Sequence, residues 1–293
     1  MDEARSQTTG AEAADLASTA AGDHPDPSGL HCRGTAAADV AAALEVFARG
    51  FTFTRSFTHP YLAVRLGPAW VLRDAPRRRG AYRNEEWIAH GLPPQEVDGL
   101  AREHTRGKFA VCAICGTGEP EEPLRAGFKA LGYRLGTTEA LMVHRLGSIP
   151  QCVSPAVIER VTTSECAQRL AKAAGSRQIL PEHLIEAGPL RQYVAMVDGD
   201  LVGWVRSVVV GDATWCSNMY VRLAHRRRGI AGAMLCRMLR DDQAAGAKAA
   251  VLLASHSGEK LYPVVGYEHI GTLLLFTPPR GWASDAQWPP VRA

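Results

Sequence analysis

Hydrophobic and polar residues follow two different periods in the last third of the chain. Residues 193–197 and 201–210 are largely apolar runs, and the Asp-Gly pair between them suits the tight turn of a hairpin. A third strand-like segment ends at Val221. Beyond it, apolar residues recur close to the helical period, at Ile230, Met234, Leu235 and Met238. The pattern predicts a strand, a turn and a helix in this order.

A comparable set of elements is predicted for the first half of the chain. The pattern predicts helices at 35–48, 94–103 and 123–130, a helix beginning at Glu85, extended segments at 51–57 and 61–66, and strands at 69–72, 108–115 and 140–144. Residues 108–144 and 249–276 share the order strand, helix, hydrophobic-Gly-Tyr, strand. We therefore predict that the first half is a degenerate copy of the second.

The length and the local composition predict two domains. A chain of 293 residues exceeds one ordinary domain. Residues 1–30 contain six acidic residues, one basic residue and no aromatic residue, which predicts a flexible leader. The predicted divisions are the leader at 1–30, an N-terminal domain at 31–147, a linker at 148–155, a C-terminal domain at 156–280 and a tail at 281–293.

The charge and the cysteines limit the classes of function. A net charge of +3 gives no broad surface for nucleic acid, and no apolar run reaches the length of a membrane span. The first residues lack a basic segment followed by an apolar one, so we expect no secretion signal. Seven cysteines at irregular spacing favour reduced thiols and a cytoplasmic protein, and Cys112 and Cys115 have no second pair with which to hold a metal. We predict no membrane, nucleic-acid or metal partner.

The turn before the last predicted helix carries three arginines followed by small residues. The first turn of a helix exposes unpaired backbone N–H groups at the positive end of the dipole, and small residues let phosphate oxygens approach them. The turn has neither a Gly-x-Gly-x-x-Gly fingerprint nor a Gly-Lys-Ser/Thr ending. The residues predicted to bind a pyrophosphate and the chain attached to it are Met219, Tyr220, Val221, Arg226, Arg227, Arg228, Gly229, Ile230, Ala231 and Gly232.

Two motifs in this region resemble those of a known enzyme family. The spacing Arg226-x-x-Gly229-x-Ala231 resembles the signature of the GNAT acetyltransferase superfamily. Residues 255–267, in which Tyr262 precedes a Gly-Tyr pair, are similar to the second cofactor motif of that family. The two motifs occur in the family's order, with a helix and a strand predicted between them.

The resemblance implies a fold, a cofactor and roles for two residues. The implied fold is α/β, with two GNAT-like halves that are each a twisted, mostly antiparallel mixed sheet flanked by helices. The implied acyl donor is acetyl-CoA, with Ser257 as a partner of the pantetheine arm and Tyr262 as the acid that protonates the departing thiolate. Because the first half has no equivalent of the arginine turn, it is not expected to bind acetyl-CoA in that way.

The general base is less well defined by the sequence. An attacking amine must be neutral, and many members of the family carry a glutamate on the strand before the turn. Residues 216–219 contain no carboxylate, so this chain departs from that pattern. His256 is the candidate base because it titrates near neutral pH, and Asp212 and Glu259 are weaker candidates. Ordered water, or capture of an amine that is already neutral, is an alternative.

The acceptor is expected to be an amine held by carboxylates and aromatic rings. The candidate substrate-binding residues are Glu85, Trp87, Trp204 and Trp215, and the ordinary alternative for each tryptophan is core packing. These residues predict N-acetylation of a small-molecule amine, with an aminoglycoside-type antibiotic as one candidate. The amine of an amino acid, peptide or protein is the alternative substrate. Two other classes remain open, a non-catalytic CoA sensor and a nucleic-acid-binding module.

Overall fold

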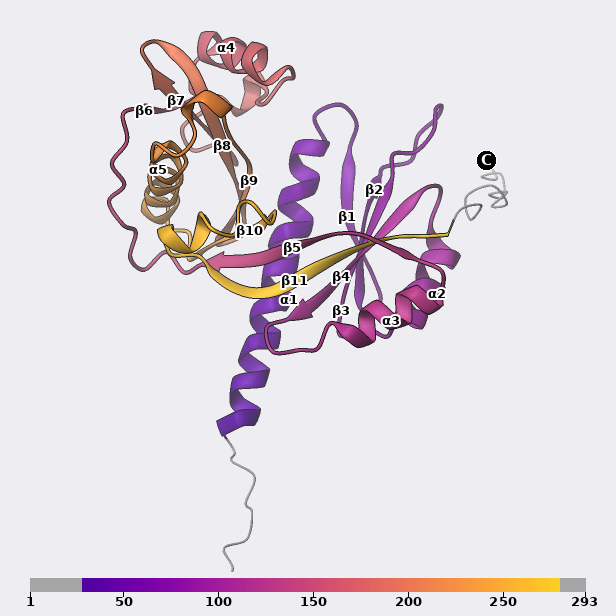
Figure 1. Ribbon diagram of the computed structural model, residues 1–293. Coiled ribbons are helices and arrows are strands. Elements are labelled where there is room, and N and C mark those ends of the chain that lie inside the picture. Colours follow the sequence, from indigo (N-terminus) through magenta and orange to yellow (C-terminus); the bar gives the residue numbers. More distant parts are fainter. Residues whose placement is uncertain (1–27, 280–293) are drawn as a thin grey trace, which may run out of the picture.

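The computed structural model describes residues 28–279. The predicted tail at 281–293, and the predicted leader apart from its last three residues, lie outside the described residues. The strands form one open sheet (Figure 1). In chain order they are β1 (Tyr61–Leu66), β2 (Ala69–Asp74), β3 (Glu85–His90), β4 (Phe109–Gly116), β5 (Arg134–His144), β6 (Val157–Arg160), β7 (Leu190–Val197), β8 (Asp200–Val210), β9 (Ala213–Val221), β10 (Ala249–Ala254) and β11 (Glu268–Thr277).

Helices cover both faces of this sheet. The α-helices are α1 (Ser28–Arg55), α2 (Pro94–His104), α3 (Glu122–Ala130), α4 (Ser164–Ala174) and α5 (Ile230–Ala244). Short 3₁₀ turns are η1 (Pro181–His183), η2 (Leu223–His225) and η3 (Tyr262–Val265). Within residues 28–279 no helix is both long enough and apolar enough to cross a membrane.

The two halves repeat one arrangement of strands, as the sequence predicted. In the first half β1, β2 and β3 are antiparallel neighbours and β3 pairs in parallel with β4. In the second half β7, β8 and β9 are antiparallel neighbours and β9 pairs in parallel with β10. Each parallel pair is connected by one helix, α2 or α5. The predicted mixed, mainly antiparallel α/β fold is confirmed.

The halves exchange strands, which the sequence did not predict. The strand order is β1-β2-β3-β4-β11-β5-β10-β9-β8-β7-β6. The C-terminal strand β11 therefore lies between β4 and β5 of the first half, and β5 lies between β11 and β10 of the second. Figure 1 shows β5 and β11 side by side, bridging the two groups of strands. The chain boundary near residue 150 thus does not separate two sheets.

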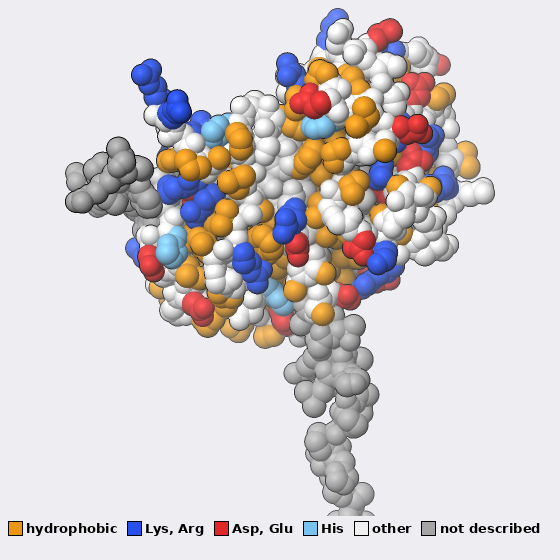
Figure 2. Space-filling model, turned by 180° about the vertical axis from the view of Figure 1, so that it is seen from behind, with side chains coloured by type: hydrophobic (Ala, Val, Ile, Leu, Met, Phe, Trp, Pro, Cys, Tyr) orange, Lys and Arg blue, Asp and Glu red, His pale blue; other side chains and the backbone are white. Residues whose placement is uncertain are grey.

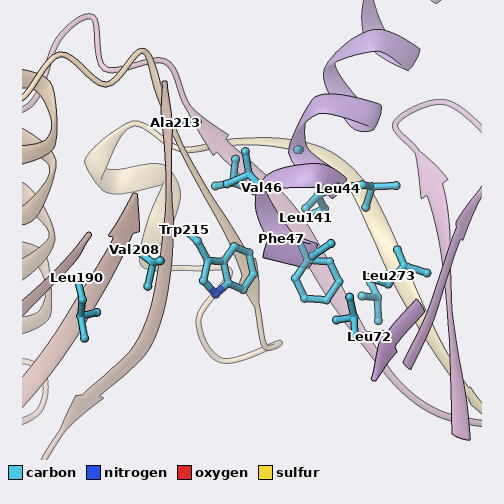
Figure 3. Close-up of a cluster of buried hydrophobic side chains, with 14 of the residues drawn as sticks. Leu44, Val46, Phe47, Leu72, Leu141, Leu190, Val208, Ala213, Trp215 and Leu273 are labelled. Atoms are coloured by element: carbon cyan, nitrogen blue, oxygen red, sulfur yellow. The ribbon is translucent and has the colours of Figure 1, made fainter. Parts of the chain in front are cut away.

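One long helix, α1, packs on the face shared by both halves. A single hydrophobic cluster extends from α1 to strands of both halves. Phe47 lies between Trp215 on one side and Leu72 and Leu273 on the other (Figure 3). Its ring centroid is 5.1 Å from that of Trp215. Gly50 permits this approach, because a Cβ there would lie 2.2 Å from the Cβ of Trp215.

The opposite face of the sheet is covered separately in each half. Helices α2 and α3 enclose a cluster that includes Trp87, Phe128 and Phe276. Helix α5 covers the second half and contributes Ile230, Met234, Leu235 and Met238 to another cluster. These four residues are the ones whose helical spacing predicted a buried face.

Two local predictions are wrong. Residues 51–57 were expected to be extended, but α1 continues to Arg55. The aromatic side chains there stack on their own helix and on η1, with Phe53 5.1 Å from the His183 ring, so tertiary contact outweighs their strand propensity. Glu85 was expected to begin a helix, but it begins β3. Its fully buried carboxylate pairs with Arg106 at 2.9 Å and Arg73 at 3.4 Å, and these ion pairs fix the strand.

The prediction of reduced cysteines is wrong for one pair. A disulfide joins Cys152, in the segment between the halves, to Cys236 of α5. The spacing gave no sign of this pairing because the two residues are 84 positions apart. The other described cysteines, Cys112, Cys115, Cys166 and Cys216, are free.

Helix α5 is fixed to the sheet by a buried carboxylate. Asp242 is fully buried and accepts hydrogen bonds from Arg191 on β7 at 2.6 Å, Ser207 on β8 at 2.8 Å and Thr214 on β9 at 2.9 Å. Burial raises the pKa of Asp242, and the hydroxyl and guanidinium donors oppose that rise. A buried charge without its partner is strongly destabilising, so this network holds the helix on three strands.

We expect Asp242→Ala to destabilise the protein by about 3–5 kcal/mol, because Arg191 then remains buried without a counterion. Urea unfolding followed by circular dichroism measures the loss. Asp212→Ala is the matched control: Asp212 pairs with Lys248 at 2.8 Å, but its side chain is 66% exposed. Equal unfolding midpoints for the two variants would contradict this account of α5.

Candidate active site

The sheet opens between β9 and β10. Registered pairs join Ala213–Trp215 to residues 249–251 and go no further. On the other side of β9, the register with β8 shifts between Trp204 and Arg206, and Asn218 has a positive φ of 56°. A β-bulge is therefore present just before Met219. Its effect is to turn the end of β9 away from β10.

The arginine turn follows β9 directly. Arg226 donates from Nε to the Val221 carbonyl at 2.9 Å, which closes the turn on the strand end. Arg227 and Gly229 both have positive φ, 62° and 77°. Gly229 is the N-cap of α5 and contributes no side-chain cap, so the N–H groups of the first turn lack helical acceptors. This is the geometry that binds phosphate oxygens.

A cavity of about 530 Å³ lies over this turn. It is lined by Met219, Tyr220, Val221, His225, Arg226, Arg227, Gly229, Ile230, Ala231, Gly232, Ser255, Ser257, Gly258, Leu261 and Tyr262. These residues include every predicted cofactor-binding residue except Arg228. The Arg228 side chain is exposed and lies 3.5 Å from His225.

A second cavity, of about 540 Å³, meets the first. Met219, Ser255 and Tyr262 line both cavities. The second cavity receives residues from α1, β3, β5 and β11 as well as from β8 and β9, so both halves enclose it. Its other lining residues are Phe47, Phe51, Thr54, Arg55, Glu86, Cys112, Thr137, Glu139, Arg206, Trp215, Ser217, Asn218, Leu253, Leu273 and Leu275.

Comparison with known proteins agrees with this geometry. A protein-family model described as an acetyltransferase (GNAT) domain matches residues 189–269. This stretch of the second half therefore resembles a GNAT domain. The match begins just before β7 and includes both cavity-lining motifs. No curated protein matches the chain significantly.

Solved structures resemble the chain over both halves. A GCN5-related N-acetyltransferase from Kribbella flavida is 18% identical with a TM-score of 0.57, covering 82% of this chain and 96% of that one. One from Sphaerobacter thermophilus is 18% identical with a TM-score of 0.49, covering 72% and 78%. A tandem GNAT protein from the clavulanic acid biosynthesis pathway is 14% identical with a TM-score of 0.46, covering 73% and 81%. The Kribbella structure shows the same fold across both halves.

Tyr262 lies at the junction of the two cavities. It lies on η3, and 8% of the residue is exposed. Burial raises the pKa of its hydroxyl above the ordinary value, so the group holds its proton at neutral pH. Nearby, the Ser255 and Ser257 hydroxyls are 3.2 Å apart. A protonated phenol beside the strand opening can donate to a leaving group there.

None of the three candidate bases lines either cavity. The side chain of His256 is 94% exposed and faces Glu259 at 3.6 Å, and neither residue lines the two cavities. Asp212 lies at the far end of β9, in the turn before that strand, paired with Lys248. The structure does not bring these residues to the strand opening.

The four candidate substrate-binding residues separate into different environments. Trp215 lines the second cavity. Trp204 stacks on Tyr220, with ring centroids 4.4 Å apart. Trp87 is fully buried under α2 and donates to Thr105 at 2.8 Å, and Glu85 is buried in its ion pairs with arginines.

Two charged residues in the second cavity were missed by sequence reasoning. Arg206 interrupts the apolar run of β8, and Glu139 precedes the apolar end of β5. A charge within a strand that is otherwise apolar was the available signal, because burial of such a charge needs a reason. Glu86 joins them from β3. Within residues 189–269 the wall of the second cavity has one arginine, Arg206, and the carboxylates that line this cavity come from the first half of the chain.

Among described residues 28–279, no three His, Cys, Asp or Glu side chains form a group that could hold a metal ion. The small residues Gly229, Ala231 and Gly232 and the free N–H groups of the first turn of α5, in contrast, fit a diphosphate. A Cβ at Gly229 would lie 2.7 Å from the Val153 carbonyl oxygen, so the turn cannot accept a larger residue without moving.

We expect Gly229→Ala to weaken acetyl-CoA binding at least about tenfold, because a non-glycine residue at positive φ costs roughly 1–2 kcal/mol and the turn must also shift from Val153. Isothermal titration calorimetry measures the affinity. Gly99→Ala on α2 is the control, since a Cβ there meets nothing within 4 Å. Wild-type affinity in Gly229→Ala would show that the turn does not bind the cofactor.

Proposed function

We propose that the protein is an acetyl-CoA-dependent N-acetyltransferase that acts on the amine of a small molecule. The observation that carries this proposal is the meeting of two cavities at Met219, Ser255 and Tyr262. One cavity has the N–H groups suited to a diphosphate, and the other is enclosed by both halves of the chain. Acetyl-CoA supplies the acetyl group as a thioester.

Different groups of the chain would bind the cofactor, stabilise the developing charge and donate a proton. The first turn of α5 binds the diphosphate, which aims the acyl end along the opening beside β9. Residues 218–219 lie outside the registered β8–β9 pairs, so a backbone N–H at this bulge is available to stabilise negative charge on a carbonyl oxygen. Tyr262 donates its proton to the departing sulfur. A sheltered cavity of about 540 Å³ receives the amine.

Enclosure favours a small acceptor over a protein. An aminoglycoside-type antibiotic, acetylated as a means of resistance, is one candidate class, since carboxylates at Glu86 and Glu139 suit a cationic amine. An amino acid or a short peptide is the second candidate class. The two classes differ in one respect, because an aminoglycoside has no anionic group.

Two non-enzymatic functions fit the structure less well. A nucleic-acid-binding module needs a continuous basic surface, whereas the face shown in Figure 2 intersperses Lys and Arg with acidic and hydrophobic side chains. A CoA sensor explains the first cavity but gives no use for the second. Purified protein incubated with acetyl-CoA and a panel of amines, with free thiol release as the readout, separates all three functions.

We expect Tyr262→Phe to lower kcat by about 10²–10⁴-fold, because the hydroxyl is the general acid, while acetyl-CoA affinity stays within about twofold. Thiol release under saturating substrate measures kcat, and calorimetry measures the affinity. Tyr133→Phe is the matched control: it removes a buried tyrosine hydroxyl that bonds Asp98 at 2.8 Å, far from the cavities. An unchanged kcat in Tyr262→Phe would show that Tyr262 is not the general acid.

A further inference from the structure

Arg206 is a half-buried cation that forms no ion pair with an acidic side chain among the described residues. Its Nε donates to the Ser217 hydroxyl at 3.1 Å, and the side chain lines the second cavity. Burial lowers the pKa of its guanidinium to about 10. The other deeply placed arginines have carboxylates, such as Arg191 with Asp242 and Arg106 with Glu85. A cation kept in a cavity without a counterion is suited to an anionic ligand.

The opposite wall of the same cavity has an excess of negative charge. Glu86 and Glu139 both line it, and only Arg55 stands against them, 3.1 Å from Glu86. Burial raises the pKa of Glu139, and burial together with repulsion from Glu139 raises that of Glu86. The group formed by Glu86, Glu139 and Arg55 thus carries one uncompensated carboxylate. A ligand cation would supply the missing charge.

The unpaired cation Arg206 and the carboxylate of Glu139 lie on opposite sides of the opening between β9 and β10. Glu139 directly precedes Ala140, whose registered partner is Ala254, so it lies level with Ser255 at the junction of the cavities. Arg206 is on β8, opposite Ser217 and two strands away from β10. Phe47, Phe51 and Trp215 give the space between them an apolar wall.

We propose that the acceptor is a small zwitterion with an amine, a carboxylate and an apolar body, in which Arg206 binds the carboxylate and Glu139 receives the amine proton. This inference rests on the proposed acetyl transfer. It selects the amino-acid class of acceptor over the aminoglycoside class, because a polycation places like charge against Arg206.

The step balances in protons and bonds. The ammonium group loses one proton to the Glu139 carboxylate, and the neutral nitrogen forms a bond to the thioester carbonyl carbon. The carbon–sulfur bond breaks, the sulfur takes the Tyr262 proton, and a second proton from nitrogen restores Tyr262. The products are an amide, a free thiol and one proton, which Glu139 releases to water.

The test of Arg206 uses amines that differ only in the carboxyl group. The panel comprises free amino acids, their methyl esters and an aminoglycoside, assayed by thiol release and by mass of the product. We expect free amino acids with apolar side chains to be preferred. Arg206→Gln should lower kcat/KM for the preferred amino acid about 10–100-fold, which is the effect of losing one hydrogen bond to a charged group. The same substitution should leave kcat/KM for the methyl ester unchanged.

Controls keep the result interpretable. Arg125→Gln, on α3, removes an arginine whose ion pair with Glu121 lies outside the cavities. Thermal unfolding and acetyl-CoA affinity report whether Arg206→Gln is folded, and Arg206→Lys, which keeps the charge, should retain part of the preference. Equal losses for acid and ester, or a preferred acceptor without a carboxylate, would overturn the inference.

Glu139 is tested by a pH profile. Its carboxylate must be ionised to accept a proton, so kcat/KM falls as the pH is lowered through a pKa above the ordinary glutamate value. The titratable groups beside it in the cavity are Glu86, whose pKa it raises, and the Cys112 thiol, and Arg55 lines the same wall and pairs with Glu86. Glu139→Gln should lower kcat about 10²–10⁴-fold and abolish that acidic limb, while Glu103→Gln on the exposed surface changes neither. An unchanged limb would exclude Glu139 as the base.

Different results would contradict the zwitterionic acceptor and the proposed acetyl transfer. Turnover of esters or aminoglycosides in preference to free amino acids overturns the zwitterion and leaves acetyl transfer intact. No thiol release from any amine, with no heat of acetyl-CoA binding, overturns both.

Discussion

The exchange of β5 and β11 between the halves is the constraint on which the rest of this structure depends. Each exchanged strand is paired on both sides, β11 with β4 and β5, and β5 with β11 and β10. A strand paired on both sides has no free edge, so neither half can complete its sheet alone. The two halves therefore share one continuous sheet, and the second cavity is lined by residues of both.

This continuity explains how one cavity can draw residues from distant segments. The parallel pair β9–β10 ends early, and the space left open beside it faces β5, which belongs to the first half. Helix α1 closes the remaining side, seated by Gly50 and Phe47 against Trp215. The first half thus supplies part of the wall of the second cavity.

The treatment of buried charge distinguishes scaffold from site. In the scaffold, two buried carboxylates each have several donors: Asp242 has three, and Asp74 pairs with Arg83 at 2.6 Å and Arg77 at 2.8 Å. In the second cavity, Arg206 has only a serine hydroxyl, and Glu139 faces another carboxylate. An uncompensated charge lowers the free energy of unfolding. Such charges are found in proteins at sites where a ligand of opposite charge binds. Paired and unpaired charges occur in the same sheet, and the unpaired charges described here line the second cavity.

The sequence by itself determined the features that depend on neighbours in the chain. The hairpin at Asp198-Gly199, where both φ values are positive, the buried face of α5 and the glycine turn at 229 are set by local backbone preference and short-range spacing. Only the tertiary structure decided where β11 inserts, why residues 51–55 remain helical and which charges meet at the opening. Strand pairing between residues more than a hundred positions apart leaves no local pattern, since an apolar strand can pair with any other of similar length. Glu139 and Arg206 became site residues only because that pairing brought two halves of the chain to one cavity.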